Sequence, residues 1–232
     1  VLFFLYALFA KSAIVWEIVR SLMTDQISNI QVFISEVDHL VSDERYYDAL
    51  YYVETNIIPN FPIQCSSSHY SSESCNLILF VSKVYYLNQE FDEAKKYLSM
   101  LENTEYAKNS FDYIVLKALL LARTGEYKKA RKYLKHKKVE SFSVIQKLTI
   151  EYYIGNCFFF EGNYKEASKY FHRCLVNVKS KGYSELRAKV HYMLGYVSFC
   201  RCFFKLAEAY YIRALNEFKY LGKKNMIGIT HQ

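Results

Sequence analysis

The stretch "YYIGNCFFFEGNYKEASKYF", from Tyr152 to Phe171, decides how this chain folds. It is crowded with aromatic residues but holds three small ones at spaced positions, Gly155, Gly162 and Ala167. The segment "YMLGYVSFCRCFFKLAEAYY", 192–211, repeats the pattern 40 residues later. A fixed period of this length indicates a structural repeat rather than a cofactor-binding loop.

The small-residue position recurs through the chain as a series of five alanines, separated by 45, 36, 37 and 40 residues. Each alanine is followed four residues later by a bulky apolar residue. A small residue lets two helices approach closely, and a large residue one turn later fills the space beside it. We therefore predict antiparallel helix pairs whose signature residues are Ala49, Ala94, Ala130, Gly155, Ala167, Phe171, Gly195, Ala207 and Tyr211.

The composition agrees with helices joined by short turns. Of 232 residues, 52% are hydrophobic and 18% aromatic, which is ample for a core, whereas only 2 are proline and 7 glycine. An all-β fold needs more of these turn residues. The net charge of +7 permits an acidic partner without requiring one.

The cysteines show no disulfide framework, since Cys157 and Cys174 fall at apolar positions of helical patterns. The chain also has no Asn-x-Ser/Thr glycosylation sequence. Both features predict a cytoplasmic or nuclear setting. The apolar opening "VLFFLYALFAKSAIVWEIV" is interrupted by Lys11 and Glu17, so we expect a buried helix rather than a membrane span, and no membrane partner.

The repeat resembles the tetratricopeptide family, whose pattern is Trp-x2-Leu-Gly-x2-Tyr, then Ala-x3-Phe, then Pro. The chain departs from it at the Trp position, which holds Glu151 and His191, and it lacks the terminal proline. The resemblance implies an all-α, right-handed superhelical array of antiparallel helix pairs. The matching residues are Ile154, Gly155, Phe158, Ala167 and Phe171 in one unit, and Leu194, Gly195, Ala207 and Tyr211 in the next.

This resemblance divides the chain into three parts. Residues 1–28 are expected to form a capping helix or a partial repeat, and residues 29–222 about five helix pairs. A loop insertion is expected over 59–75, "PNFPIQCSSSHYSSESC". Residues 223–232 are expected to begin a further helix or to cap the array.

No motif for catalysis or cofactor binding is present. The loop residues Cys65, His69 and Cys75 offer three potential metal ligands, but a structural zinc site needs four, so we predict no metal. The glycines never form a phosphate-binding loop. The basic run Lys128–Lys138 is expected to be a solvated helix face, because no nucleic-acid-binding fold accompanies it. We therefore expect a non-enzymatic protein without cofactors and without a nucleic-acid partner.

In tetratricopeptide proteins the first helix of each pair lines a concave groove. Carried over to this chain, the groove is aromatic and apolar, which is typical of a partner interface. It lacks the full set of basic residues with which chaperone-binding members hold a peptide carboxylate. The resemblance places in the groove Leu79, Lys83, Tyr86, Val115, Leu119, Tyr152, Asn156, Phe159, Phe160, Tyr192, Tyr196 and Phe199.

We therefore expect a scaffold that binds a protein or peptide partner and self-associates as a dimer. "RYYDALYYVE" and "EFDEAKKYL" resemble the amino-terminal arrays of tetratricopeptide subunits of the anaphase-promoting complex, a cell-cycle ubiquitin ligase. Two alternatives remain open. The 40-residue period and "ALNEFKYLGKKNMIG" resemble bacterial peptide-sensing regulators, and "QKLTIEYYIGNCFFFEGNYKEA" resembles proteasome-lid subunits.

Overall fold

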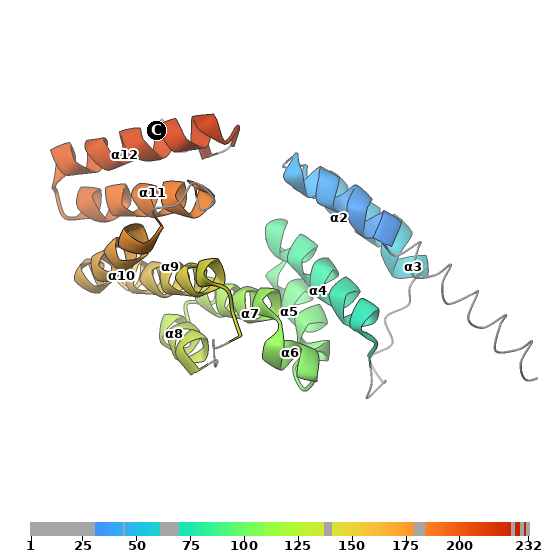
Figure 1. Cartoon of the computed structure of the whole chain (residues 1–232). Coiled ribbons are helices and arrows are strands. Elements are labelled where there is room, and N and C mark those ends of the chain that lie inside the picture. Colours follow the sequence, from blue (N-terminus) through green and yellow to red (C-terminus); the bar gives the residue numbers. More distant parts are fainter. Residues whose placement is uncertain are drawn as a thin grey trace, which may run out of the picture. The chain divides into compact units, whose positions relative to one another are not determined.

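The computed structural model describes residues 31–43, 45–60, 70–136, 141–178, 184–223, 226, 227 and 230. The chain divides into two compact units, Val1–Tyr106 and Ala107–Gln232, which are described separately. All regular structure in the described residues is helical (Figure 1). This confirms the predicted all-α fold of paired helices. The predicted cap over 1–28 lies outside the described residues.

The first unit begins with helical residues 31–42 and continues through α2 (Tyr46–Tyr52), η1 (Val53–Ile57) and α3 (Ile58–Asn60). These last three elements form one continuous helical stretch, because η1 is a π-helical turn inserted into it. The helix buries Ala49, Val53 and Ile57 on one face, at the four-residue spacing that the sequence pattern predicts.

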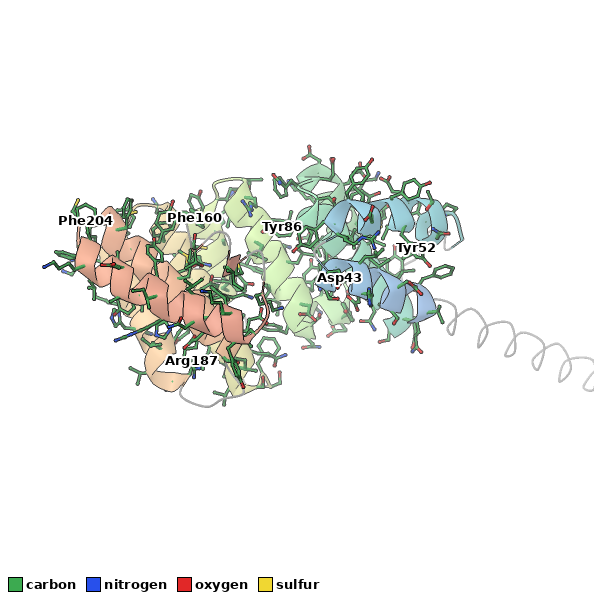
Figure 2. All side chains as sticks on the ribbon, turned by 90° about the horizontal axis from the view of Figure 1, so that it is seen from above. Asp43, Tyr52, Tyr86, Phe160, Arg187 and Phe204 are labelled. Carbon is green, nitrogen blue, oxygen red and sulfur yellow. The ribbon has the colours of Figure 1, made fainter. Side chains whose placement is uncertain are left out.

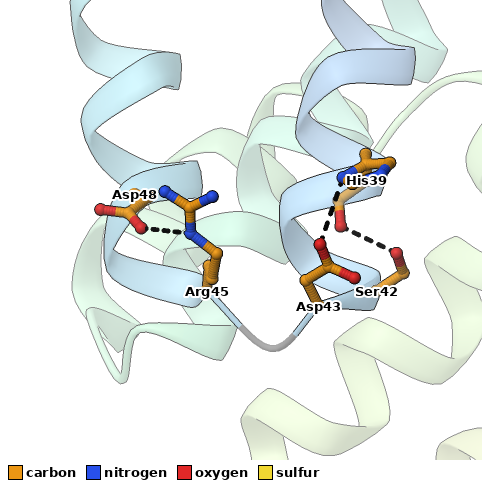
Figure 3. A network of polar contacts seen from close by, with 5 residues as sticks. All are labelled: His39, Ser42, Asp43, Arg45 and Asp48. Atoms are coloured by element: carbon orange, nitrogen blue, oxygen red, sulfur yellow. Dashed lines mark hydrogen bonds and ion pairs between the residues drawn. The ribbon is translucent and has the colours of Figure 1, made fainter.

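The turn between residues 31–42 and α2 carries a small polar network at the surface (Figure 3). Arg45 Nε donates to Asp48 Oδ2 at 2.7 Å, and Ser42 Oγ donates to the carbonyl of His39 at 2.8 Å. His39 Nδ1 lies 3.3 Å from Asp43 Oδ2. Because all of these groups are exposed to water, the network shapes the turn but adds little to stability.

The next pair, α4 (Ser72–Leu87) and α5 (Phe91–Met100), packs around an almost wholly buried α4. Ser82 takes the position that glycine holds in later repeats. Its buried hydroxyl donates to the carbonyl of Ala94 at 2.7 Å, so the polar group is satisfied at the helix crossing.

The predicted loop over 59–75 is too long at both ends. Residues 59–60 belong to α3, and α4 begins at Ser72. Ser71 starts α4 by accepting a hydrogen bond from the backbone N–H of Ser74 at 3.2 Å, a cap that the serine-rich sequence provides. Cys75 is consequently a buried helical residue.

The second unit consists of successive helices in which each contacts the next. A short helix, α6 (Glu105–Asn109), spans the unit boundary. Figure 1 shows α11 and α12 lying side by side as the last long pair. The elements that follow α6 are α7 (Phe111–Arg123), α8 (Tyr127–His136), α9 (Val144–Phe160), α10 (Tyr164–Asn177), α11 (Ser184–Cys200) and α12 (Phe204–Tyr220).

The turns inside the four pairs from α4–α5 to α11–α12 share one geometry. Gln89, Gly125, Gly162 and Cys202 all have left-handed backbones, with φ between 62° and 78°. In the turn between α9 and α10, the N–H of Gly162 donates to the carbonyl of Phe159 at 2.9 Å. The N–H of Asn163 donates to the carbonyl of Phe158 at 2.9 Å, which completes a Schellman ending. Gln89 and Cys202 thus adopt a left-handed backbone conformation that costs less energy for glycine than for residues with a side chain.

The signature glycines provide close approach rather than flexibility. A Cβ atom on Gly155 would lie 2.7 Å from Cε1 of Phe171, and one on Gly195 would lie 2.7 Å from Cδ1 of Tyr211. In these two pairs, the ring one turn after the signature alanine therefore packs on the glycine of the preceding helix. All five signature alanines are buried.

Candidate functional site

A groove of about 800 Å³ runs between α11 and α12 in the second unit. Pockets of this size are typical of ligand sites in proteins. We call it the terminal groove. It is lined by Tyr192, Tyr196 and Phe199 from α11, by Phe204, Lys205, Ala207, Glu208, Tyr211, Ile212 and Leu215 from α12, and by Thr230.

The large apolar side chains of the terminal groove are open to solvent. Phe199 is 53% exposed, Phe204 59% and Ile212 51%, and Tyr196 is 40% exposed. Figure 2 shows Phe204 at the start of α12. A continuous set of exposed apolar side chains on a folded protein marks an interaction surface.

The tyrosines give the terminal groove neutral polar groups. Burial, together with smaller effects of the neighbours Tyr192 and Tyr196, raises the pKa of Tyr211 to about 12. Burial and Tyr196 also raise the pKa of Tyr192. These hydroxyls therefore stay protonated at neutral pH and are available as hydrogen-bond donors.

Two opposite charges also line the groove, Lys205 and Glu208, one turn apart on α12. Both are exposed, and within the described part of the chain neither forms an ion pair. An occupant of the groove could therefore be matched by charge as well as by shape.

The predicted groove residues on α9 and α11 divide into two kinds. Tyr192, Tyr196 and Phe199 line the terminal groove, and Phe160 is exposed at the end of α9 (Figure 2). Phe159, however, is only 8% exposed and packs on the ring of Tyr196 with centroids 4.9 Å apart. Phe159 is thus a core residue, which corrects its assignment to an open surface.

Tyr152 and Asn156 lie one turn apart on α9, and both are partly buried. Burial raises the pKa of Tyr152 to about 12, an effect that a hydrogen bond with Asn156 opposes. Asn156 Oδ1 accepts no hydrogen bond from any described residue, yet it is closed to solvent. A ligand would reach this oxygen only after the side chain rotated.

The remaining predicted groove residues do not join the terminal groove. Leu79 is buried in the core of the first unit, whereas Lys83 is exposed and Tyr86 packs on Phe91 with centroids 5.8 Å apart. On α7 of the second unit, Val115 and Leu119 are half-buried. Burial of Leu79 removes it from the set of surface candidates, because its side chain has almost no accessible area.

Most of the groove residues that the sequence analysis missed lie on α12. The family resemblance assigned the groove to first helices alone, so the second helix of the last pair was overlooked. A signal for it was present in the sequence. Ala207 and Ala214 mark the buried face of α12, whereas Phe204, Glu208 and Ile212 follow one another at four-residue spacing on an exposed face. Two of these three exposed residues are large and apolar.

Metal binding and membrane insertion gain no support from the residues that the structure describes. In those ranges no three His, Cys, Asp or Glu side chains are grouped so that they could hold a metal ion. Cys65 and His69, the ligand types considered from the sequence, lie outside the described residues. None of the described helices is both long and apolar enough to cross a bilayer.

Comparison with known proteins supports the fold but assigns no family. No protein-family model matches the sequence, and no curated protein matches it significantly. Solved structures do match. PlcR from Bacillus thuringiensis, in complex with the peptide PapR7 and DNA, is 14% identical with a TM-score of 0.64, covering 86% of this chain and 74% of PlcR.

Two further structures are similar. A Rap protein complexed with Competence and Sporulation Factor is 16% identical with a TM-score of 0.63, and the match covers 87% of this chain but 53% of Rap. BtubC from P. vanneervenii is 15% identical with a TM-score of 0.55, covering 86% of this chain and 81% of BtubC. At these identities the matches establish a tetratricopeptide-like helical-repeat fold. They do not support the expected likeness to anaphase-promoting-complex subunits.

Proposed function

We propose that this protein is a non-catalytic binding module that holds a peptide or protein segment in the terminal groove. The observation that carries the proposal is the set of exposed side chains Tyr196, Phe199, Phe204 and Ile212 around one cavity of about 800 Å³. Because the helices already hold these side chains in place, binding costs little ordering of the protein.

The structural comparisons favour a peptide ligand over a permanent complex subunit. PlcR was solved in complex with the peptide PapR7 and DNA, and the Rap protein was solved in complex with Competence and Sporulation Factor. For this chain, a peptide with apolar anchors would match the aromatic walls, and the tyrosine hydroxyls would donate to its backbone carbonyls. The alternative stated from the sequence, a peptide-binding regulator, is therefore the preferred function here.

Self-association is the second candidate, because α12 exposes apolar side chains outside the groove as well. Phe203 is 50% exposed, Leu206 48% and Tyr220 87%. Light scattering at micromolar concentration distinguishes the two candidates. A stable dimer that Tyr220→Lys or Leu206→Lys dissociates favours the subunit function, and a monomer favours the peptide-binding function.

Selection from a random peptide library tests the groove directly. The full chain serves as bait, with Phe199→Asp/Ile212→Asp as counter-bait and Tyr220→Asp as the matched control for an exposed apolar residue on the same helix. We expect selected peptides to lose about ten-fold or more in affinity with the double variant, and to bind the control like the wild type. Peptides that bind the double variant and the wild type equally would contradict the proposal.

A further inference from the structure

The two units of this chain carry opposite net charges. Val1–Tyr106 holds 14 acidic and 6 basic residues, whereas Ala107–Gln232 holds 9 acidic and 24 basic ones. The formal charges are therefore −8 and +15, which together give the +7 of the whole chain. A division of charge of this size between two halves of a chain is typical of a protein that binds a partner of opposite charge.

Exposed positive charge of the second unit gathers on two second helices, α8 and α10. Lys135 of α8 reaches α10, where its Nζ lies 5.8 Å from the ring centroid of Tyr170. Exposed lysines one turn apart recur at equivalent positions of both helices, 37 residues apart. We call this surface the basic face, and its residues are Lys128, Lys132, Lys135, Lys165 and Lys169.

Little of this charge is neutralised by neighbouring acids. Lys169 pairs with Glu166 at 2.5 Å, but the other four lysines of the basic face form no ion pair with any residue that the structure describes. Arg131 of α8 differs from them, because it pairs with Glu161 and is only 13% exposed. The lysines of the basic face are therefore the charges that an acidic partner can reach.

The first unit presents a matching surface on α2 and η1. Asp48 and Glu54 are exposed there, and Tyr47 and Tyr51 are 77% and 64% exposed. We call these four residues the acidic face. Carboxylates pair with lysine, and an exposed tyrosine ring attracts an ammonium group to its π face. The acidic face thus offers lysine two kinds of contact.

The surroundings of the acidic face keep it negative. Residues 31–60 hold 6 acidic residues and 1 basic residue, Arg45. Arg45 Nε donates to one oxygen of Asp48, and the hydroxyl of Tyr85 donates to one oxygen of Glu54 at 3.2 Å. Each carboxylate therefore keeps a second oxygen that can accept from a lysine of a partner.

We infer that the basic face of one chain docks on the acidic face of a second copy. The contact joins two different surfaces, so its repetition builds a head-to-tail oligomer. Complementary charge brings the faces together, and the lysine stems cover the exposed tyrosine rings. This interaction goes beyond the proposed peptide binding, because none of the residues of either face lines the terminal groove.

A nucleic acid suits the basic face less well than an acidic protein surface. Single strands bind to aromatic rings that are free to stack on bases. Tyr170 is half-buried and already holds two cations, with Lys135 Nζ 5.8 Å and Arg173 Cζ 4.6 Å from its centroid. Sequence-specific readout of a duplex needs an element that enters a groove. Because α8 and α10 both pack on α9, neither stands clear of the unit.

Sedimentation velocity of the whole chain at two salt concentrations tests the inference. The basic-face variant is Lys132→Glu/Lys165→Glu, and the acidic-face variant is Asp48→Lys/Tyr51→Lys. Micromolar samples are compared in about 0.05 M and about 0.5 M NaCl, where charges are screened over roughly 14 Å and 4 Å. Circular dichroism checks the fold, which should be kept because all four residues are exposed.

A matched control separates the faces from the net charge. Lys147→Glu/Lys219→Glu changes the charge of the second unit as much as the basic-face variant does, at two exposed lysines outside the basic face. We expect this control to weaken association less than about two-fold. A short DNA duplex, titrated against the wild type and the basic-face variant, tests the nucleic-acid alternative.

We expect the wild type to form concentration-dependent oligomers in low salt and to dissociate in high salt, because screening removes the attraction. Each face variant should weaken association about ten-fold or more. An equimolar mixture of the two variants should restore association, since each then meets an intact face of opposite charge on the other.

Four results would overturn the inference. A wild-type chain that stays monomeric in low salt lacks the contact. Oligomers that the control weakens as much as the face variants depend on net charge and not on these faces. Oligomers that persist in high salt and that Leu206→Lys dissociates use the apolar side of α12. A DNA duplex that binds the basic face more tightly than a second copy does would make a nucleic acid its occupant.

Discussion

The helix pairs α9–α10 and α11–α12 have the same sequence spacing and the same internal packing, yet a face that is covered on the first pair is open on the second. Phe159 is 8% exposed and its equivalent Phe199 is 53% exposed. Inside each pair a glycine meets an aromatic ring at the same distance. The difference comes from the next helix, because α11 covers the first pair. In a repeat protein, the neighbouring helix decides whether a repeated packing position becomes buried core or exposed surface.

Replacing Phe159 and Phe199 by alanine, one at a time, should give the largest difference in unfolding free energy between the two pairs. Phe159→Ala removes a buried ring beside Tyr196 and should lower the free energy of unfolding by about 3–5 kcal/mol. Phe199→Ala removes a ring that is half in water and should cost less than about 1 kcal/mol. Urea unfolding of both variants measures this, and equal losses would show that Phe199 is as buried as Phe159.

Replacing each signature glycine by alanine should give a smaller difference in unfolding free energy between the two pairs. Gly155→Ala pushes against Phe171, which is fully buried and cannot move aside, so we expect a loss of about 1–3 kcal/mol. Gly195→Ala pushes against Tyr211, which can shift toward the groove, so the loss should be smaller. Thermal unfolding compares the two, and a larger loss for Gly195→Ala would contradict the account.

The pairs should also differ in their response to acid. The residue equivalent to Glu151 of α9 is His191 of α11, and its Nδ1 lies 3.5 Å from Oε2 of Glu217. Burial lowers the pKa of His191 below its ordinary value of 6.5; Glu217 opposes this shift, and Arg213 and Arg187 add to it. The unfolded chain therefore takes up a proton more readily than the native state as the pH falls through 6.5.

It follows that His191 should cost stability between about pH 7.5 and pH 5.5. We expect urea unfolding of the wild type to show a larger loss over this range than that of His191→Gln. Because groups distant from His191 keep their surroundings in the variant, the difference between the two proteins reports on His191 and its contact with Glu217. An identical pH dependence would show that burial of this imidazole has no effect on its titration.

The smallest effect is expected at the turns within the two pairs. Gly162 and Cys202 hold equivalent left-handed positions, with φ of 77° and 62°. Cys202→Gly should raise the free energy of unfolding by up to about 1 kcal/mol, whereas Gly162→Ala should lower it by about as much. Differential scanning calorimetry would register opposite shifts in Tm, and a lower Tm for Cys202→Gly would contradict the assigned strain.

The sequence was sufficient to predict the helical pairs, because the alanine series and the glycine–aromatic spacing are local patterns. Three of the residues that it assigned to a groove, Tyr192, Tyr196 and Phe199, line the terminal groove. It did not distinguish Phe159 from Phe160, which are neighbours on one helix and differ only in what packs against them. The role of α12 was missed for the same reason, since coverage by another helix is a tertiary property.

Hydroxyl-radical footprinting of the full chain, read by mass spectrometry at Phe159 and Phe199, tests the central claim most directly. Our account predicts that Phe199 is labelled readily in the free protein and becomes protected when a library-selected peptide binds. Phe159 should be protected in both states. Equal labelling of the two rings in the free protein, or no change at Phe199 on peptide binding, would contradict the assignment of the terminal groove as a binding site.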